Sequence, residues 1–477
     1  MATDAQALDS GQAQEEKYAE EHLMHDPRPV EELNNMVMEA MRTAGIEYWI
    51  VVIVLGLIVG VCLFGAWGYM IFEGIGLAGI NRPNYWGVFI VNLVFWIGIS
   101  HAGTFVSAIL RVFNAEYRRP FTRAAELMTT FALAAASLYP LIHLGRVWRV
   151  YWMVPYPNQR LLWPNFHSIL VWDMIAITTY LIGSTLYLYF PLLPDLAMAR
   201  DRSSGWRRVI YRILSLGWRG SEKEWKNLRT AIKIFAFAII PVMFSVHTIV
   251  SWDFAVTMVE GWHSTIFGPF FVAGAIFSGV SAVVSVLFII RSTMKNMDYF
   301  IRKEHFDALG KLILIFSMVW TYFYFNEYLL EWYGGDELAQ VILEMYKTGP
   351  MAWIWYGMII VNIIIPWATL WNKKIRRTPW VMFIISILVN FGMYAERYLI
   401  VTGVLQKNRF PFSWGEYQPQ LVEILISIGS IALFLFLYAI ASRLIPLVPL
   451  WEVKEKKKAH FLRRVGKSLV SGVSETE

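Results

Sequence analysis

Four ionisable side chains stand near the ends of long apolar segments of the sequence, inside them or directly beyond them. They are His143, Asp173, His247 and Asp253. A charge within a membrane is costly, so a His or Asp in such a position points to a function. Carboxylates and imidazoles accept protons and hydrogen-bond polar oxygens. Together these four predict a site that takes protons from a polar headgroup.

Other residues accompany these four. His101 lies deeper in an apolar segment, and His167 lies at the start of another. Trp172 and Trp252 each immediately precede one of the two aspartates and would provide flat apolar walls for a ring. A simpler alternative remains open for His143 and His167, which could cap helices or bond loop carbonyls.

A second group of ionisable residues occurs in later segments and comprises Glu327, Glu331, Glu396 and Arg397. Glu327 and Glu331 are four residues apart and therefore share one face of a helix. This group is a candidate proton path. Alternatively, the two glutamates pair with Arg397 in a structural salt bridge, and the sequence leaves both roles open.

Transmembrane helices must position these residues. Only 16% of the 477 residues are charged, against about 25% in soluble proteins. Segments long enough to cross about 30 Å of hydrocarbon must be helical, because each backbone amide has to bond within its own segment. We expect ten of them, at 47–72, 87–112, 125–146, 166–190, 230–251, 267–291, 309–331, 351–371, 379–402 and 421–445. The predicted fold class is all-α integral membrane.

Charge in the loops predicts the orientation. Most Lys and Arg lie in alternate loops, at 113–124, 191–229, 292–308 and 372–378. The positive-inside rule places these loops and both termini in the cytoplasm. This gives a cytoplasmic tail at 1–46, a transmembrane domain at 47–445 and a basic cytoplasmic tail at 446–477. Because topology explains the basic loops, we expect no nucleic-acid partner.

With this orientation, the ionisable residues inside the spans crowd towards the non-cytoplasmic face. Arg111 and Lys233 lie at cytoplasmic helix ends, where we expect their side chains to snorkel into the headgroup region.

Cysteine content limits the chemistry of the chain. Cys62 is the only cysteine, whereas an iron–sulfur cluster needs about four cysteine ligands. The sequence has no C-x-x-C-H motif and no zinc-binding spacing. We therefore expect no haem, cluster or metal in this chain. A quinol combines two polar oxygens with an apolar tail, and its oxidation releases protons to bases and electrons to an acceptor. That acceptor must belong to another subunit.

Several short motifs carry a family resemblance. They are 100–104 (SHAGT), 143–146 (HLGR), 163–166 (WPNF), 172–173 (WD), 245–247 (SVH), 251–253 (SWD) and 261–269 (GWHSTIFGP). Over about 45–450 the chain resembles the NrfD-like family of polysulfide-reductase membrane subunits. Within this family it is most similar to ActC, the quinol-binding membrane subunit of bacterial alternative complex III.

The resemblance implies two four-helix bundles, helices 2–5 and 6–9, flanked by helices 1 and 10, in a bacterial inner membrane. It implies menaquinol bound near the periplasmic face of the first bundle by His143, Asp173, His247 and Asp253, with His101 deeper. The implied complex is a respiratory or photosynthetic quinol oxidoreductase in which this subunit is not catalytic alone. Its implied partners are an iron–sulfur subunit at the periplasmic face, a multihaem cytochrome c and a homologous NrfD-like membrane subunit. Proton translocation would then run through the second group.

Three alternatives compete with this interpretation. The chain could bind a b-type haem between His143 and His247. It could be a secondary transporter that binds solute among buried charges. It could also be a structural or proton-conducting sister subunit that binds no quinone.

Overall fold

The structure is a computed structural model that describes residues 30–153, 169–407, 410–454, 459–465 and 468–474. This part of the chain contains ten helices long and apolar enough to cross a membrane. Their bounds are Ile46–Glu73, Val88–Val112, Glu116–His143, Val171–Asp201, Glu222–Ala255, Phe267–Thr293, Lys303–Gly334, Ala352–Thr369, Pro379–Gln406 and Leu421–Leu444. The all-α membrane fold predicted from the sequence is confirmed. The third, fourth and fifth helices extend well beyond their predicted apolar segments, on the side of the basic loops.

Four spans form the first bundle. They are α5 (Val88–Thr104) continued by η3 (Phe105–Ile109) and α6 (Leu110–Val112), α7 (Thr122–Ala136) with α8 (Leu138–His143), α9 (Ile169–Asp201) and α11 (Glu222–Ala255). Helix α5 packs on α7, α7 on α9, α9 on α11 and α11 back on α5. The ring of contacts is therefore closed.

The second bundle is closed in the same way. It comprises α12 (Phe267–Thr293), α14 (Lys303–Gly334), α16 (Ala352–Ile359) with η6 (Ile360–Ile364) and α17 (Ile365–Thr369), and α19 (Pro379–Tyr398) with η7 (Leu399–Gly403) and η8 (Val404–Gln406). Helix α14 packs on α12 and α17, α16 packs on α19, and α19 packs on α12. Helix α12 also packs on α5 and α11 and so joins the two bundles.

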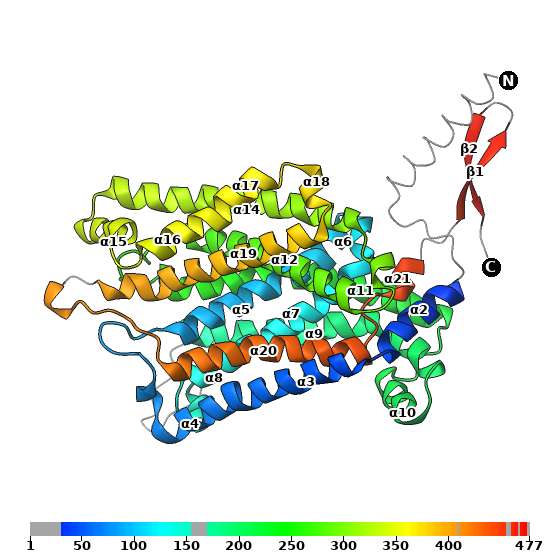
Figure 1. The fold of residues 1–477 in the computed structure, drawn as a ribbon, viewed down its shortest axis with the longest axis horizontal. Helices are drawn as coiled ribbons and strands as arrows, with labels where there is room; N and C mark the ends of the chain where they lie inside the picture. Colours follow the sequence, from blue (N-terminus) through cyan, green and yellow to red (C-terminus); the bar gives the residue numbers. More distant parts are fainter. Residues whose placement is uncertain (1–29, 154–168, 408–409, 455–458, 466–467, 475–477) are drawn as a thin grey trace.

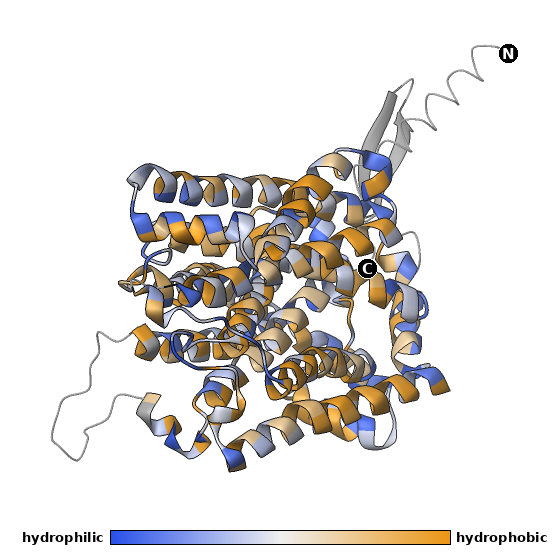
Figure 2. Cartoon of the chain, turned by 60° about the vertical axis from the view of Figure 1, so that its left-hand side comes forward, coloured by the Kyte–Doolittle hydropathy of each residue, from blue (hydrophilic) through white to orange (hydrophobic). Residues whose placement is uncertain are grey.

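The first and last spans lie together beside the bundles. The first consists of α3 (Ile46–Ile58), η1 (Val59–Gly65) and α4 (Ala66–Glu73), and α20 (Leu421–Leu444) packs along it. Large apolar side chains on α3, including Trp49, Ile53 and Leu57, are more than half exposed. Figure 2 shows the same apolar character along the outer helices. In a membrane this surface faces lipid.

Small residues hold α5 tightly between its neighbours. A Cβ added at Gly103 would lie 2.0 Å from both the Ala125 carbonyl oxygen and Thr129 Oγ1 of α7. On the other side, a Cβ at Gly279 of α12 would lie 2.4 Å from the Cβ of Ala102. These close approaches explain the small residues that follow His101 in its motif, because they allow α7 and α12 to fix the turn that carries the imidazole.

We call the end of the molecule that holds loops 202–221, 294–302 and 370–378 the basic end. Here lie α2 (Val30–Arg42), α10 (Gly205–Leu214), α13 (Met297–Phe300), α18 (Lys373–Arg376) and α21 (Leu450–Lys454). Helix α2 is tied to these loops by the ion pairs Arg202–Glu31 at 2.7 Å and Lys295–Glu39 at 2.5 Å. Both ends of the described membrane domain therefore lie at the basic end.

Short elements complete the fold. At the opposite end α15 (Glu337–Thr348) follows α14. Besides η8, the described 3-10 turns are η2 (Ile75–Leu77), η4 (Glu116–Phe121), η5 (Val147–Met153) and η9 (Pro411–Ser413). Near the C-terminus β1 (Ala459–Val465) pairs antiparallel with β2 (Ser468–Ser474), outside the helical domain.

Candidate functional site

Two carboxyl groups meet in the first bundle at the end opposite the basic loops. Asp173 lies near the start of α9 and Asp253 near the end of α11, and their side chains are in hydrogen-bonding contact. Asp173 is buried and Asp253 is half-buried. A hydrogen bond between two carboxyls requires a proton on one of them, because two carboxylates in contact repel each other. The pair can therefore share one proton in this arrangement.

Each carboxyl of this pair also retains unused bonding capacity. Oδ1 of Asp173 and Oδ1 of Asp253 are buried and have no hydrogen-bond partner among the described residues. A buried oxygen without a partner costs about 1–3 kcal/mol. Such a cost is accepted where a ligand, water or transferred proton completes the site.

Trp172 and Trp252 form an aromatic wall beside the carboxyl pair. Their rings meet edge to face with centroids 6.2 Å apart. They come from α9 and α11, the same helices that carry Asp173 and Asp253. The sequence therefore identified four residues that the structure brings to one place across the α9–α11 contact.

A buried imidazole pair lies deeper in the same bundle. The rings of His101 on α5 and His247 on α11 are 4.6 Å apart, and both side chains are fully buried. Neither ring nitrogen of His247 has a hydrogen-bond partner of good geometry among the described residues. His247 is thus a buried base whose lone pair is available.

His101 has two acceptors for its two nitrogens. Its Nδ1 lies 2.6 Å from the Ile97 carbonyl oxygen, and its Nε2 lies 2.8 Å from the Met243 carbonyl oxygen. A neutral imidazole has one N–H and can donate to only one of these carbonyls, whereas a protonated ring donates to both. If His101 gains a proton, both of its N–H groups therefore have a carbonyl acceptor in place.

The remaining histidines predicted for this site stand apart. His143 is the last residue of α8, at the same end of the bundle as the carboxyl pair. Its Nδ1 is buried and lacks a hydrogen-bond partner among the residues the structure describes. His167 falls outside the described residues.

The second group of ionisable residues contains an ion pair, but not the predicted one. Arg397 on α19 pairs with its neighbour Glu396 at 2.8 Å, and both are buried. Glu327 on α14 accepts a hydrogen bond from Ser264 at 2.6 Å instead. The alternative in which Glu327 and Glu331 pair with Arg397 is therefore wrong. Adjacent residues on a helix can still pair when one side chain curls back, and sequence spacing did not reveal this.

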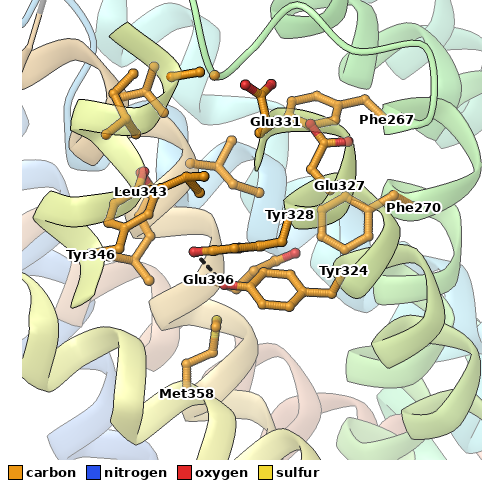
Figure 3. A pocket seen from close by; sticks show the side chains of 16 residues that line it. Phe267, Phe270, Tyr324, Glu327, Tyr328, Glu331, Leu343, Tyr346, Met358 and Glu396 are labelled. Atoms are coloured by element: carbon orange, nitrogen blue, oxygen red, sulfur yellow. Dashed lines mark hydrogen bonds between the residues drawn. The ribbon is translucent and has the colours of Figure 1, made fainter. Parts of the chain in front are cut away.

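A small cavity opens among these glutamates in the second bundle (Figure 3). Glu327 and Glu331 line it from α14, and Glu396 lines it from α19. Its volume is about 60 Å³. A water needs roughly 10–15 Å³, whereas a cavity that takes up benzene measures about 150 Å³. The cavity therefore accommodates a few waters and is too small for an aromatic headgroup.

The side chains of Tyr324 and Tyr328 line this cavity next to Glu327 and Glu396, as Figure 3 shows. The hydroxyls of Tyr324 and Tyr328 are hydrogen-bonded at 3.2 Å, and Trp355 donates to Tyr324 Oη at 2.7 Å. Trp320 donates to Glu396 at 3.3 Å. Hydroxyls, waters and carboxyls in one enclosed space can relay a proton.

Phe271 of α12 connects the two groups. Its ring centroid is 5.9 Å from that of His247 in the first bundle. On the other side, the guanidinium of Arg397 lies over the same ring at 4.4 Å. One aromatic side chain therefore separates the imidazole pair from the Glu396–Arg397 pair.

A third ionisable cluster, which the sequence analysis missed, lies at the basic end. Arg123 is fully buried and pairs with Asp195 at 3.2 Å and with Glu126 at 3.6 Å. Nearby, Glu452 of α21 pairs with Arg111 at 2.6 Å and with Arg118 at 2.9 Å. The prediction that Arg111 snorkels is therefore wrong, and buried charges inside the spans are not confined to one end. The sequence analysis missed this cluster because the helices at the basic end extend beyond their apolar segments.

Comparison with known proteins agrees with this architecture. The family model for polysulphide reductase, NrfD, matches residues 76–407. The chain belongs to the NrfD family. Among the residues the structure describes, no group of three or more His, Cys, Asp or Glu side chains could hold a metal ion.

Three relatives in this family align over most of the chain. A Halobacterium salinarum protein, provisionally named as a membrane subunit of dimethyl sulfoxide reductase, is 26% identical over 86% of this chain and 93% of its own length. A selenate reductase subunit of Mesobacillus selenatarsenatis is 24% identical over 78% and 88%. The Hdr-like menaquinol oxidoreductase integral membrane subunit of Archaeoglobus fulgidus is 25% identical over 88% and 99%. This NrfD-family chain is thus similar to membrane subunits of oxidoreductase complexes.

Proposed function

We propose that this chain is the quinol-oxidising membrane subunit of a respiratory or photosynthetic oxidoreductase. The observation that carries the proposal is the Asp173–Asp253 contact, with a free oxygen on each carboxyl, next to an aromatic wall. The name of the Archaeoglobus fulgidus relative, a menaquinol oxidoreductase subunit, supports menaquinol as the substrate.

Oxidation of one quinol releases two protons and two electrons, and the residues of the first bundle can account for the protons. The carboxyl pair, which can share one proton, has room for another. The available lone pair of His247 can take the second, and His101 can bind a proton between its two carbonyl acceptors. His143 and His167 are candidates to orient the headgroup. Because the sequence has one cysteine, the electrons pass to an iron–sulfur cluster in a partner subunit.

The second bundle would carry protons. The cavity lined by Glu327, Glu331 and Glu396 has room for a few waters, and Arg397 balances the buried charge of Glu396. Phe271 places this group against the imidazole pair, so a proton gained by His247 would change the electrostatic field at Arg397. This arrangement supports coupling between quinol oxidation and proton translocation.

The proposal also fixes an orientation and a set of partners. The basic end would face the cytoplasm of a bacterial inner membrane with both termini, by the positive-inside rule. The iron–sulfur subunit would then dock at the periplasmic face, near Asp173, and pass electrons to a multihaem cytochrome c. A homologous NrfD-like subunit would lie alongside in the membrane. Assignment of this assembly to alternative complex III rests on the sequence motifs.

The second candidate function is that of a proton-conducting sister subunit that binds no quinone. The water-sized cavity in the second bundle favours it, because that feature needs no quinone in the first bundle. The two functions differ at the Asp173–Asp253 pair. In the quinol-oxidising subunit this pair takes a proton from bound quinol, whereas in the sister subunit no quinone binds there.

The test is Asp173→Asn and Asp253→Asn in the purified complex, with Asp298→Asn as the matched control. Asp298 is an exposed carboxylate at the basic end. We expect each site variant to lose bound quinone and to slow quinol-dependent reduction of the electron acceptor at least 100-fold, the range for loss of a general base. Full activity and full quinone content in both site variants would reject the quinol site and favour the sister-subunit function.

A further inference from the structure

A basic cavity opens on the side of the molecule at the basic end. Its volume is about 640 Å³. Its charged lining residues are the cations Arg111, Arg118, Arg119, Arg229 and Lys233 and the single carboxylate Glu116. Positive charge thus strongly exceeds negative charge on its wall.

The ion pairs of Glu452 remove only part of this excess. Its one negative charge is shared between Arg111 and Arg118, and Arg119 donates to the backbone carbonyl of Glu452 at 2.8 Å. These bonds fix the three guanidinium groups in place. Arg229 and Lys233, one turn apart on α11, are exposed on the opposite wall. The cavity is therefore a preorganised site for an anion.

An apolar groove of about 920 Å³ continues from this cavity along the membrane-facing surface. The two share Val112 and Phe237 in their walls. The groove then follows α11 as far as Thr248, a length of roughly 16 Å at about 1.5 Å per residue. That length matches most of an extended acyl chain.

The groove lies in the seam between the two bundles. One wall is α11 of the first bundle, the other is α14 with Phe316, Val319 and Phe323, and α12 forms the floor. Phe237 is 65% exposed, so the groove opens outward to the lipid. A ligand seated here would contact both bundles.

We infer that the basic cavity and this groove together bind one anionic phospholipid. The cations hold the phosphate of the headgroup, and an acyl chain fills the groove between α11 and α14. Charge complementarity selects this occupant, because a neutral quinone tail would fill the groove without balancing the excess positive charge on the cavity wall. Basic cavities between transmembrane helices bind anionic headgroups by this chemistry.

The test compares lipids on the full-length chain, purified in detergent and stripped of lipid. Binding of phosphatidylglycerol is measured by native mass spectrometry for the wild type, Lys233→Glu and Lys233→Glu/Arg229→Glu. The control is Lys226→Glu, an exposed lysine on α11 outside the cavity lining. Loss of one cation would weaken binding about fivefold, so we expect each reversal to Glu to weaken it by more than about fivefold, with the control unchanged.

Three results would overturn the inference. Equal binding of phosphatidylcholine would mean that the site does not select charge. Equal competition by soluble glycerol phosphate would mean that the site takes a free phosphate and the groove plays no part. Loss of bound quinone in Lys233→Glu, with lipid binding intact, would assign the groove to the quinone tail. Each of these outcomes is separate from the Asp173→Asn test, which concerns the other end of the first bundle.

Discussion

Replacement of Glu452 by Gln is expected to loosen α21 from the membrane domain. Glu452 is buried, and its carboxylate lies 2.6 Å from Arg111 and 2.9 Å from Arg118. Burial alone would raise the pKa of Glu452, but the two guanidinium charges outweigh it and lower the pKa from its ordinary value of 4.5 to about 2. At about 1.4 kcal/mol per pKa unit, the shift corresponds to roughly 3 kcal/mol of stability at neutral pH. Removing one partner of a buried ion pair has a similar cost of about 3–5 kcal/mol.

The direction of the pH dependence follows from the lowered pKa. The native state binds the proton less readily than the unfolded state, so the stabilisation is complete above pH 4.5 and is lost as the pH falls towards 2. By about pH 3.5, roughly 1 kcal/mol of it is gone. Glu452→Gln cannot ionise and should show no such loss.

Amide hydrogen exchange of 450–454 measures the opening of α21 directly. At pH 7 we expect exchange about 100-fold faster in Glu452→Gln than in the wild type, after correction for intrinsic rates. The control is Glu304→Gln, which breaks the more exposed Glu304–Arg377 pair of 3.2 Å at the same end. Partly exposed pairs contribute at most about 1 kcal/mol, so its effect should stay within about fivefold. Equal protection of α21 in Glu452→Gln and the wild type would refute this reasoning.

Three further predictions concern other parts of the molecule. Gly103→Ala should destabilise the domain by about 1–3 kcal/mol in thermal unfolding, because its Cβ would lie 2.0 Å from α7 atoms, whereas Gly60→Ala, with nothing within 4 Å, should be neutral. Glu327→Gln should retain quinol-dependent electron transfer and the two protons released per quinol, but lose proton translocation beyond those two, measured in proteoliposomes; unchanged translocation would remove it from the path. Arg397→Gln should lower stability by about 3–5 kcal/mol, because it leaves Glu396 buried without its partner at 2.8 Å; the same melting temperature in variant and wild type would contradict this.

The sequence predicted the ten spans because membrane crossing depends on a local property. A continuous apolar run and the absence of charge are both readable within one segment. The sixth span, predicted at 267–291, is Phe267–Thr293 in the structure. The prediction was weakest where helices run past the hydrocarbon, as in Glu222–Ala255, because polar residues there do not distinguish a helix from a loop.

The candidate site was predictable only in part. Asp173 and Asp253 were identified because each is a carboxylate in an apolar segment, but their contact depends on the packing of α9 against α11. The partner of Arg397 was not predictable from the sequence, because Glu327, Glu331 and Glu396 were all candidates. The side-chain rotamers, which only the structure gives, decide that the partner is Glu396. The buried Arg123 cluster escaped notice because its residues look like an ordinary basic loop.

By itself, then, the sequence determined the membrane fold, the number of spans and the presence of costly buried groups, since hydrophobicity and charge act residue by residue. Only the tertiary structure decided which groups share protons and which form ion pairs. It also decided that a cavity among Glu327, Glu331 and Glu396 is large enough for a few waters but not for a ring, and that a basic cavity joins an apolar groove. These properties depend on distances of a few ångströms between different helices, and such distances follow from the packing of the whole domain.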